Sequence, residues 1–155
     1  MNKLKKGDKI PNFELYDQNG KLFRFIDQPG NKNLVIYFYP KDDTPGCTAE
    51  ACGFRDHFEE FTNYGCHVIG ISSDNTESHK HFAEKHQIPF TLLSDPDNMV
   101  RKKFGVPKST LGMLPGRVTY ITDKHGIIRH IFNSQLRASQ HVKEALHILK
   151  QLQYD

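Results

Sequence analysis

The sequence predicts an α/β domain in which helices flank a mixed central sheet. Three observations support this prediction. Short apolar runs typical of buried strands alternate with helix-like segments over residues 34–104. Two further apolar runs then flank a turn at residues 123–126, which indicates an antiparallel hairpin. A last segment over residues 139–152 carries apolar side chains at helical spacing. This alternation is typical of a layered domain with parallel and antiparallel strands in one sheet.

Each element is assigned from local patterning. Strands are short runs of apolar or alternating residues, and helices carry apolar side chains three and four positions apart. The turn at Gln18-Asn19-Gly20 predicts an N-terminal hairpin. The predicted strands are residues 13–16, 22–25, 34–39, 67–72, 90–93, 117–122 and 127–131. The predicted helices run from the loop after residue 39 to about Tyr64, and over residues 76–86, 97–104 and 139–152. This order fits a thioredoxin-like arrangement, in which the loop after a central strand carries the chemistry.

Length and composition favour one soluble domain spanning residues 1–155. The chain of 155 residues is long enough to bury a core, and it contains no repeat or low-complexity linker. No apolar run is long enough to cross a bilayer, and the basic N-terminus lacks the apolar stretch of a signal peptide. We therefore predict a cytoplasmic protein with no membrane partner. A transit peptide removed before residue 1 is the open alternative.

Charge and histidine content predict neither a nucleic-acid partner nor a metal. The net charge is only +3, and the basic runs at residues 3–6 and 101–103 are interpreted as solvated faces. His79, His81 and His86 are placed on a polar helix face, and no histidine pairs with a cysteine at zinc-ligand spacing. No glycine-rich phosphate loop or nucleophile elbow is present, so no cofactor is expected.

The most informative segment is the loop between the strand at 34–39 and the helix that follows it. Cys47 lies at this strand–loop–helix junction, where free backbone N–H groups and the helix dipole favour an anion. The natural anion is a thiolate, the reactive form of cysteine. Hydroxyl groups of Thr44 and Thr48 are placed to donate to this thiolate or to a bound oxygen ligand. We predict Cys47 as a reactive thiol.

Four residues are predicted to support Cys47. Pro40 and Pro45 bracket the loop, stiffen it and shield the sulfur from bulk water. Glu50 is placed in the first helical turn, where it would cap backbone N–H groups or orient a cation. Arg117 begins an apolar strand, where a guanidinium is costly to bury without an anion. It either faces Cys47 through the fold or lies at the rim, paired with a carboxylate.

The other two cysteines differ in their expected roles. Three cysteines argue against a structural disulfide framework. In an intact helix Cys52 would lie roughly 8–9 Å from Cys47 between Cα atoms, beyond the reach of about 7 Å for a disulfide. Cys52 is therefore either packing or a partner that joins Cys47 when the helix unwinds, and Gly53 favours unwinding because glycine weakens a helix. Cys66 is interpreted as a small buried hydrophobe.

At this point the residues resemble a known family. Pro40-x3-Thr44-x2-Cys47, followed by Glu50 and Cys52, is similar to the active-site signature of the peroxiredoxins. The longer segment resembles the bacterioferritin comigratory protein or peroxiredoxin Q subfamily. The resemblance covers nearly the whole chain, including Tyr37-Phe38-Tyr39-Pro40-Lys41-Asp42, Thr44-Pro45-Gly46-Cys47-Thr48, Gly70-Ile71-Ser72-Ser73-Asp74, Leu92-Leu93-Ser94-Asp95 and Leu114-Pro115-Gly116-Arg117-Val118-Thr119-Tyr120. Asp43 and Gly53 depart from the pattern.

The resemblance implies a thioredoxin-fold thiol peroxidase that reduces hydrogen peroxide and organic hydroperoxides. Cys47 would be the peroxidatic nucleophile and Cys52 the resolving cysteine, joined in an intramolecular disulfide that thioredoxin reduces. Thr44 and Arg117 would position the peroxide, with Pro40, Gly46 and Glu50 in support. The resemblance also implies a monomer in antioxidant defence, without a metal or organic cofactor.

Two other functions stay open at this level. One is a redox sensor or chaperone, in which the same disulfide switches a binding surface as the helix unwinds. The other is a general disulfide oxidoreductase, which the absence of a Cys-x2-Cys pair disfavours.

Overall fold

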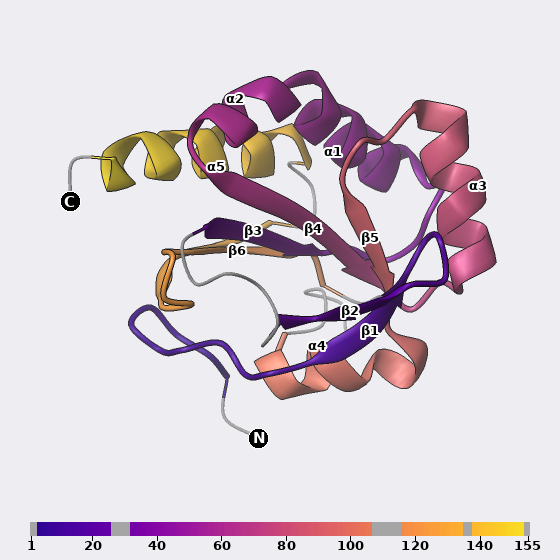
Figure 1. The fold of residues 1–155 in the computed structure, drawn as a ribbon, viewed down its shortest axis with the longest axis horizontal. Coiled ribbons are helices and arrows are strands. Elements are labelled where there is room, and N and C mark those ends of the chain that lie inside the picture. Colours follow the sequence, from indigo (N-terminus) through magenta and orange to yellow (C-terminus); the bar gives the residue numbers. More distant parts are fainter. Residues whose placement is uncertain (1–2, 26–31, 107–115, 135–137, 154–155) are drawn as a thin grey trace.

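A computed structural model shows a seven-stranded sheet with helices on both faces (Figure 1). The structure describes residues 3–25, 32–106, 116–134 and 138–153. Leu114 and Pro115 of the predicted motif lie outside these residues. The strands are β1 (Glu14–Asp17), β2 (Leu22–Arg24), β3 (Asn33–Phe38), β4 (Cys66–Ser72), β5 (Thr91–Ser94), β6 (Val118–Thr122) and β7 (Ile128–Asn133). The helices are α1 (Pro45–Asp56), α2 (Phe58–Asn63), α3 (Thr76–His86), α4 (Met99–Phe104) and α5 (Ala138–Leu152), with a 3₁₀ turn η2 (Pro96–Asn98).

The sheet is mixed, with the order β2-β1-β5-β4-β3-β6-β7. β3 and β4 are parallel, as are β4 and β5, and the other pairs are antiparallel. β3 is an almost uninterrupted apolar run because both of its faces are covered and both of its edges are paired. The predictions of the α/β class, the mixed sheet and the N-terminal hairpin are confirmed.

Each face of the sheet packs against its own set of helices (Figure 1). α1, α2, α3 and α5 cover one face, where Phe54, Phe82 and Val142 meet side chains of β3, β4 and β5. α4 and the N-terminal segment cover the other face, where Phe13 and Phe104 pack. Alternate side chains of each strand enter the two cores, as the period of two requires.

Two helices differ from their predicted bounds. The helix expected to reach Tyr64 breaks at His57, whose φ of −108° and ψ of 13° separate α1 from α2. The His57 Nδ1 atom lies 2.7 Å from Glu60 Oε1, which ties this residue to the first turn of α2. The helix expected over residues 97–104 begins at Met99 because Asp97 has a positive φ of 60°.

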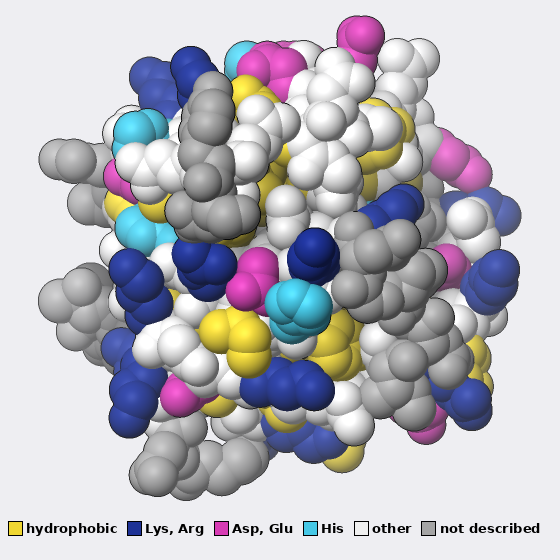
Figure 2. All heavy atoms as spheres, turned by 60° about the vertical axis from the view of Figure 1, so that its left-hand side comes forward, with side chains coloured by type: hydrophobic (Ala, Val, Ile, Leu, Met, Phe, Trp, Pro, Cys, Tyr) yellow, Lys and Arg dark blue, Asp and Glu magenta, His cyan; other side chains and the backbone are white. Residues whose placement is uncertain are grey.

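The basic run at residues 101–103 is only partly a solvated face. Lys102 and Lys103 are exposed, but Arg101 is 7% exposed and turns into the molecule. The prediction is therefore wrong for Arg101. Its backbone is fixed by Asp95, whose two carboxylate oxygens accept hydrogen bonds from the amides of Val100 and Arg101, each at 2.9 Å. Elsewhere, on the face drawn in Figure 2, lysine and arginine side chains are spread out with acidic and histidine side chains between them.

Among the described residues, no helix combines the length and the apolar character needed to cross a membrane.

Candidate functional site: a buried thiol beside an arginine

Cys47 lies in the first turn of α1, directly after the central strand β3 and the loop that leaves it. Pro45 opens the helix, and the carbonyl of Thr44 accepts the first helical hydrogen bond from the amide of Thr48 at 2.8 Å. Cys47 is 1% exposed. The predicted strand–loop–helix junction is therefore present, with the thiol on the inner side of the helix start.

Arg117 faces this thiol from the position directly before β6, the antiparallel neighbour of β3. Its Nη2 atom donates to Cys47 Sγ at 3.2 Å, and its Nη1 atom donates to Glu50 Oε1 at 2.6 Å. Each of the two predicted environments of Arg117 is therefore partly correct, because the guanidinium contacts Cys47 and also pairs with a carboxylate. It is not at the rim, however, since it is 3% exposed.

Gly46 makes this contact possible. A Cβ atom at position 46 would lie 3.0 Å from Arg117 Nη2, closer than most side-chain contacts allow. A larger residue would therefore push the guanidinium away from the sulfur. The geometry explains why a glycine precedes the cysteine.

Glu50 lies in the second turn of α1, and it does not cap the helix as predicted. The side chain is fully buried and is aimed at Arg117 instead of at the free N–H groups of the first turn. Orienting a cation was the other predicted role, and the ion pair with Arg117 fits it. Burial raises the pKa of Glu50 to about 8, against the opposing attraction of Arg117.

His141 on α5 completes the buried group, and sequence reasoning missed it. Its Nε2 atom lies 2.8 Å from the carbonyl oxygen of Ser134, so Nε2 carries a proton and donates. Its Nδ1 atom lies 2.7 Å from Thr119 Oγ1 and 3.5 Å from Glu50 Oε2. Burial lowers the pKa of His141 to about 4, so the ring is neutral at neutral pH and Nδ1 accepts from Thr119. A signal existed: His141 falls on the apolar stripe of the last predicted helix, with Ala145 and Leu149.

Thr44 and Pro40 surround the loop without contacting the sulfur through a hydrogen bond in the described structure. The Thr44 hydroxyl donates to the carbonyl of Lys41 at 2.9 Å, which stabilises the turn before α1. Pro40 is half-buried directly after β3. Asp43, between them, has a positive φ of 61° and pairs with Lys85 and His86 of α3, which lowers the pKa of its carboxyl group.

All three cysteines are free thiols in this conformation. Cys52 is half-buried on α1, five residues after Cys47. Cys66 is buried, as predicted, and burial raises the pKa of its thiol. The glycine at position 53 is also explained by packing between helices. A Cβ atom at this position would lie only 3.0 Å from Val142 Cγ2 of α5.

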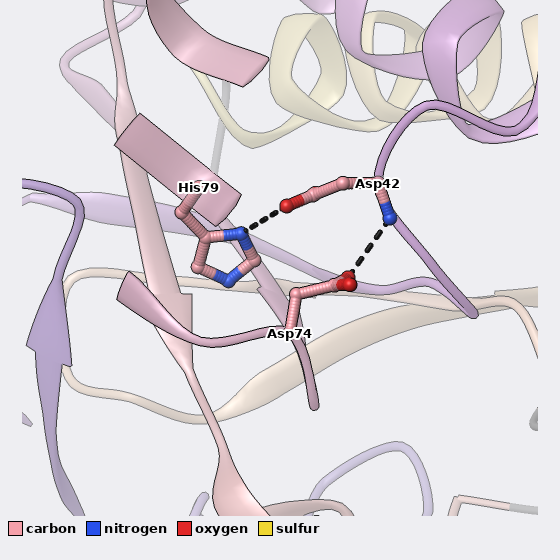
Figure 3. Close-up of side chains that lie close together, drawn as sticks. All are labelled: Asp42, Asp74 and His79. Carbon is pink, nitrogen blue, oxygen red and sulfur yellow. Dashed lines mark hydrogen bonds and ion pairs between the residues drawn. The ribbon is translucent and has the colours of Figure 1, made fainter. Parts of the chain in front are cut away.

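A buried cluster anchors the loop upstream of Cys47 (Figure 3). His79 was predicted on a polar helix face, and this prediction is wrong, since the residue is fully buried. Its Nδ1 atom lies 2.7 Å from Asp42 Oδ2, and its Nε2 atom lies 2.9 Å from the carbonyl oxygen of Leu93. Because a carbonyl only accepts, Nε2 carries a proton and donates to Leu93, while Nδ1 is hydrogen-bonded to Asp42. The Asp42 amide donates to Asp74 at 2.8 Å, as Figure 3 shows.

The ligand atoms of Asp42, Asp74 and His79 lie within 4.8 Å of one another, close enough to share a metal ion. Each of the three side chains already has hydrogen-bond partners, however. Asp42 also accepts from the hydroxyl groups of Tyr39 and Ser78, at 2.6 and 3.0 Å. The cluster therefore joins the end of β3 to α3 as a hydrogen-bonded clamp. Because its carboxylate and ring atoms are already used in hydrogen bonds, they give no reason to place a metal ion there.

Fold and site together define a class: a thiol-dependent redox enzyme with its cysteine in a helix start and a guanidinium on the sulfur. The sequence profile of the AhpC/TSA family matches residues 6–131. The chain belongs to this family of peroxiredoxins, and its relatives place it in the peroxiredoxin Q subfamily. The predicted thiol-dependent peroxidase activity is thereby confirmed as a class of function.

Three comparisons carry this assignment. Peroxiredoxin Q, chloroplastic, of Arabidopsis thaliana is 51% identical over 148 residues, which are 96% of this chain and 68% of the relative. The crystal structure of peroxidoxin BcpB from Mycobacterium tuberculosis superposes with a TM-score of 0.88 at 35% identity, covering 96% of this chain and 98% of that one. The bacterioferritin comigratory protein of Xanthomonas campestris, studied for alkyl peroxide reduction, gives 0.81 at 30% identity, with 90% and 91% covered. The thioredoxin-like fold is confirmed by these structures.

The predicted cytoplasmic location is wrong by the same comparisons. Relatives from rice and wheat that are 50% identical over 97% of this chain are named chloroplastic, as is the Arabidopsis protein. The prediction rested on the missing apolar stretch of a signal peptide, and that observation does not distinguish the cytoplasm from a plastid.

The His79–Asp42 contact is expected to stabilise the fold. Replacing His79 by Leu removes the ring nitrogen that lies 2.7 Å from the buried Asp42 carboxyl group and leaves that group short of a hydrogen-bond partner, which should lower the free energy of unfolding by about 3 kcal/mol. Replacing His81, which is exposed on the same helix, should change it by less than about 0.5 kcal/mol. Urea denaturation of both variants measures the difference. Equal losses would show that the clamp contributes no specific stability.

His141 predicts a loss of stability in acid. Its pKa is about 4 in the folded protein and 6.5 as the reference, so below pH 6.5 the unfolded chain binds the extra proton. The stabilising contribution is present above pH 6.5 and is lost as the pH falls through 4. His141→Gln keeps a donor for Ser134 and an acceptor for Thr119, so its unfolding free energy should fall less steeply between these values. Denaturation at several pH values, with the exposed His147→Gln as control, tests this, and parallel slopes would contradict it.

Proposed function

We propose that Cys47 is the nucleophile of this peroxidase. The observation that carries the proposal is the contact of 3.2 Å between its sulfur and the guanidinium of Arg117. A nearby cation favours the thiolate over the thiol, and the start of α1 adds the positive end of the helix dipole. Glu50 does not cancel this charge fully, because burial raises its pKa to about 8. A negative sulfur is therefore the group that best balances the site.

In the proposed reaction the Cys47 thiolate attacks the nearer oxygen of a hydroperoxide. An S–O bond forms while the O–O bond breaks, and the sulfur is oxidised by two electrons. The departing oxygen takes a proton and leaves as water or an alcohol, and Cys47 becomes a sulfenic acid. Arg117 and the amides of the first turn would stabilise the charge that moves onto the leaving oxygen, and the Thr44 hydroxyl would join them after it turns away from the carbonyl of Lys41.

Cys52 is the proposed resolving residue. Its thiol attacks the sulfenic sulfur, a disulfide forms, and the hydroxyl group leaves as water. Both thiols belong to α1, whose winding separates their Cα atoms by roughly 8–9 Å. The first turns must therefore unwind. Support comes from the start of the helix, where Thr44 makes no side-chain cap to the helix amides. A cap of that kind typically stabilises a helix by about 1 kcal/mol.

The remaining assignments follow from this cycle. An external dithiol, proposed as thioredoxin, reduces the Cys47–Cys52 disulfide by exchange. Hydrogen peroxide and organic hydroperoxides are the proposed substrates, and the alkyl peroxide reduction activity of the Xanthomonas relative supports the organic class. Because both cysteines lie in one chain, we propose that residues 1–155 act as a single-domain monomer.

Replacing Cys47 by Ser should abolish the peroxidase activity. A serine hydroxyl stays protonated beside Arg117 and is a much weaker nucleophile than a thiolate, so the rate should fall by more than about 100-fold. Peroxide consumption with thioredoxin, its reductase and NADPH measures this. Cys66→Ala, which removes the buried thiol on β4, is the control and should stay active. Full activity of the Cys47 variant would refute the nucleophile assignment.

Replacing Cys52 by Ser should separate the two halves of the cycle. One equivalent of peroxide should react at the rate of the unmodified protein and leave a sulfenic acid at Cys47, detectable by dimedone labelling and mass spectrometry. Steady turnover with thioredoxin should fall about tenfold or more, because no intramolecular disulfide forms. Normal turnover would show that Cys52 is not the resolving residue.

A further inference from the structure

A second buried guanidinium lies beside the site, and the proposed cycle does not use it. Arg101 of α4 is 7% exposed, whereas its neighbours Lys102 and Lys103 are exposed. Its position is fixed through its own backbone amide, which donates to Asp95 Oδ2 at 2.9 Å. The guanidinium also lies over the ring of Phe38 at the end of β3, 5.6 Å from the ring centre.

Arg101 joins the two chain segments that carry the reacting groups. Its Nη2 atom donates to the carbonyl of Tyr39 at 3.0 Å, and its Nη1 atom donates to the carbonyl of Gly116 at 2.7 Å. Tyr39 directly follows β3 and leads into the Cys47 loop. Gly116 directly precedes Arg117. The ladder between β3 and β6 ends at the pair of Phe38 and Val118, so these two carbonyls lie just past its end and Arg101 bridges them.

The charge of Arg101 is not neutralised by an ion pair among the residues that the structure describes. Its hydrogen bonds there go to carbonyl oxygens, and its Nε atom has no partner among them. Burial lowers its pKa to about 10, which still leaves it charged at neutral pH, while attraction to Asp95, Tyr120 and Cys47 acts in the opposite direction and Arg117 repels it. Through its bond to the carbonyl of Tyr39, this charge is held where the chain enters the Cys47 loop.

We propose that Arg101 is a positioning residue that holds the Cys47 loop and Arg117 in register and supplies a second positive charge to the Cys47 thiolate. This inference rests on the proposed role of Cys47. It assigns to α4, on the opposite face of the sheet from α1, a part in setting the reactivity of the thiol. A bridge with a purely structural role would hold the two carbonyls but would leave the ionisation of Cys47 unchanged.

Charge and hydrogen bonding are separated by two variants and a matched control. Arg101→Gln keeps an amide donor and removes the charge, Arg101→Lys keeps the charge, and Lys102→Gln makes the same neutral change on the exposed side of α4. The measurement is the pH at which alkylation of Cys47 by iodoacetamide is half-maximal, followed by mass spectrometry of the Cys47 peptide. Circular dichroism checks folding, and Arg101→Met replaces the glutamine variant if that variant does not fold.

We expect the midpoint of alkylation to rise by about 1 pH unit in Arg101→Gln and to stay within about 0.3 units in Arg101→Lys and Lys102→Gln. The rate of the first reaction with hydrogen peroxide at pH 7 should fall about tenfold in Arg101→Gln alone. An unchanged midpoint in the glutamine variant, or an equal rise in the lysine variant, would overturn the proposal. Failure of the unmodified Cys47 to react with peroxide would instead refute the proposed function.

Discussion

The contact between Arg117 and Cys47 is the interaction on which the rest of the site depends. One guanidinium reaches across from the start of β6 to α1 and donates to a sulfur and to a carboxylate, at 3.2 and 2.6 Å. A buried cation is stable only when anions surround it, and a buried thiolate only when cations do. Each group therefore offsets the free-energy cost of burying the other. The glycine at position 46, the register of β3 with β6 and the burial of Glu50 all serve this approach.

Burial determines the charge balance around that contact. Glu50, with its pKa raised to about 8, contributes less negative charge at neutral pH than an exposed glutamate would. His141, with its pKa lowered to about 4, contributes no positive charge there. Arg117 and Arg101 stay charged. Positive charge therefore predominates around the contact, and the cysteine sulfur is placed where a negative charge would be stabilised.

The parts of the fold that depend on local patterning could be predicted from the sequence. The strands, the two hairpins and α3 follow from apolar periodicity and turn residues. The cost of burying a guanidinium indicates that Arg117 needs an anionic partner, but it leaves open whether this partner is Cys47 or a carboxylate at the rim. The rest depends on tertiary packing. Arg101 stands in a basic run and His79 in a polar helix, so neither pattern shows that the side chain turns inward. The break at His57 and the second-turn position of Glu50 depend on where α1 begins and ends, which single-residue patterns locate poorly.

The groups that surround Cys47 come from distant parts of the chain. Arg117 lies seventy residues after the cysteine, and His141, which borders Glu50, lies on the last helix. The cation reaches the sulfur only after β6 has inserted beside β3, late in the order in which the chain is synthesised. If Cys47 is the nucleophile proposed above, an incomplete chain would present it as an ordinary thiol without the neighbouring guanidinium. Sensitivity to oxidants would then arise only together with the native topology.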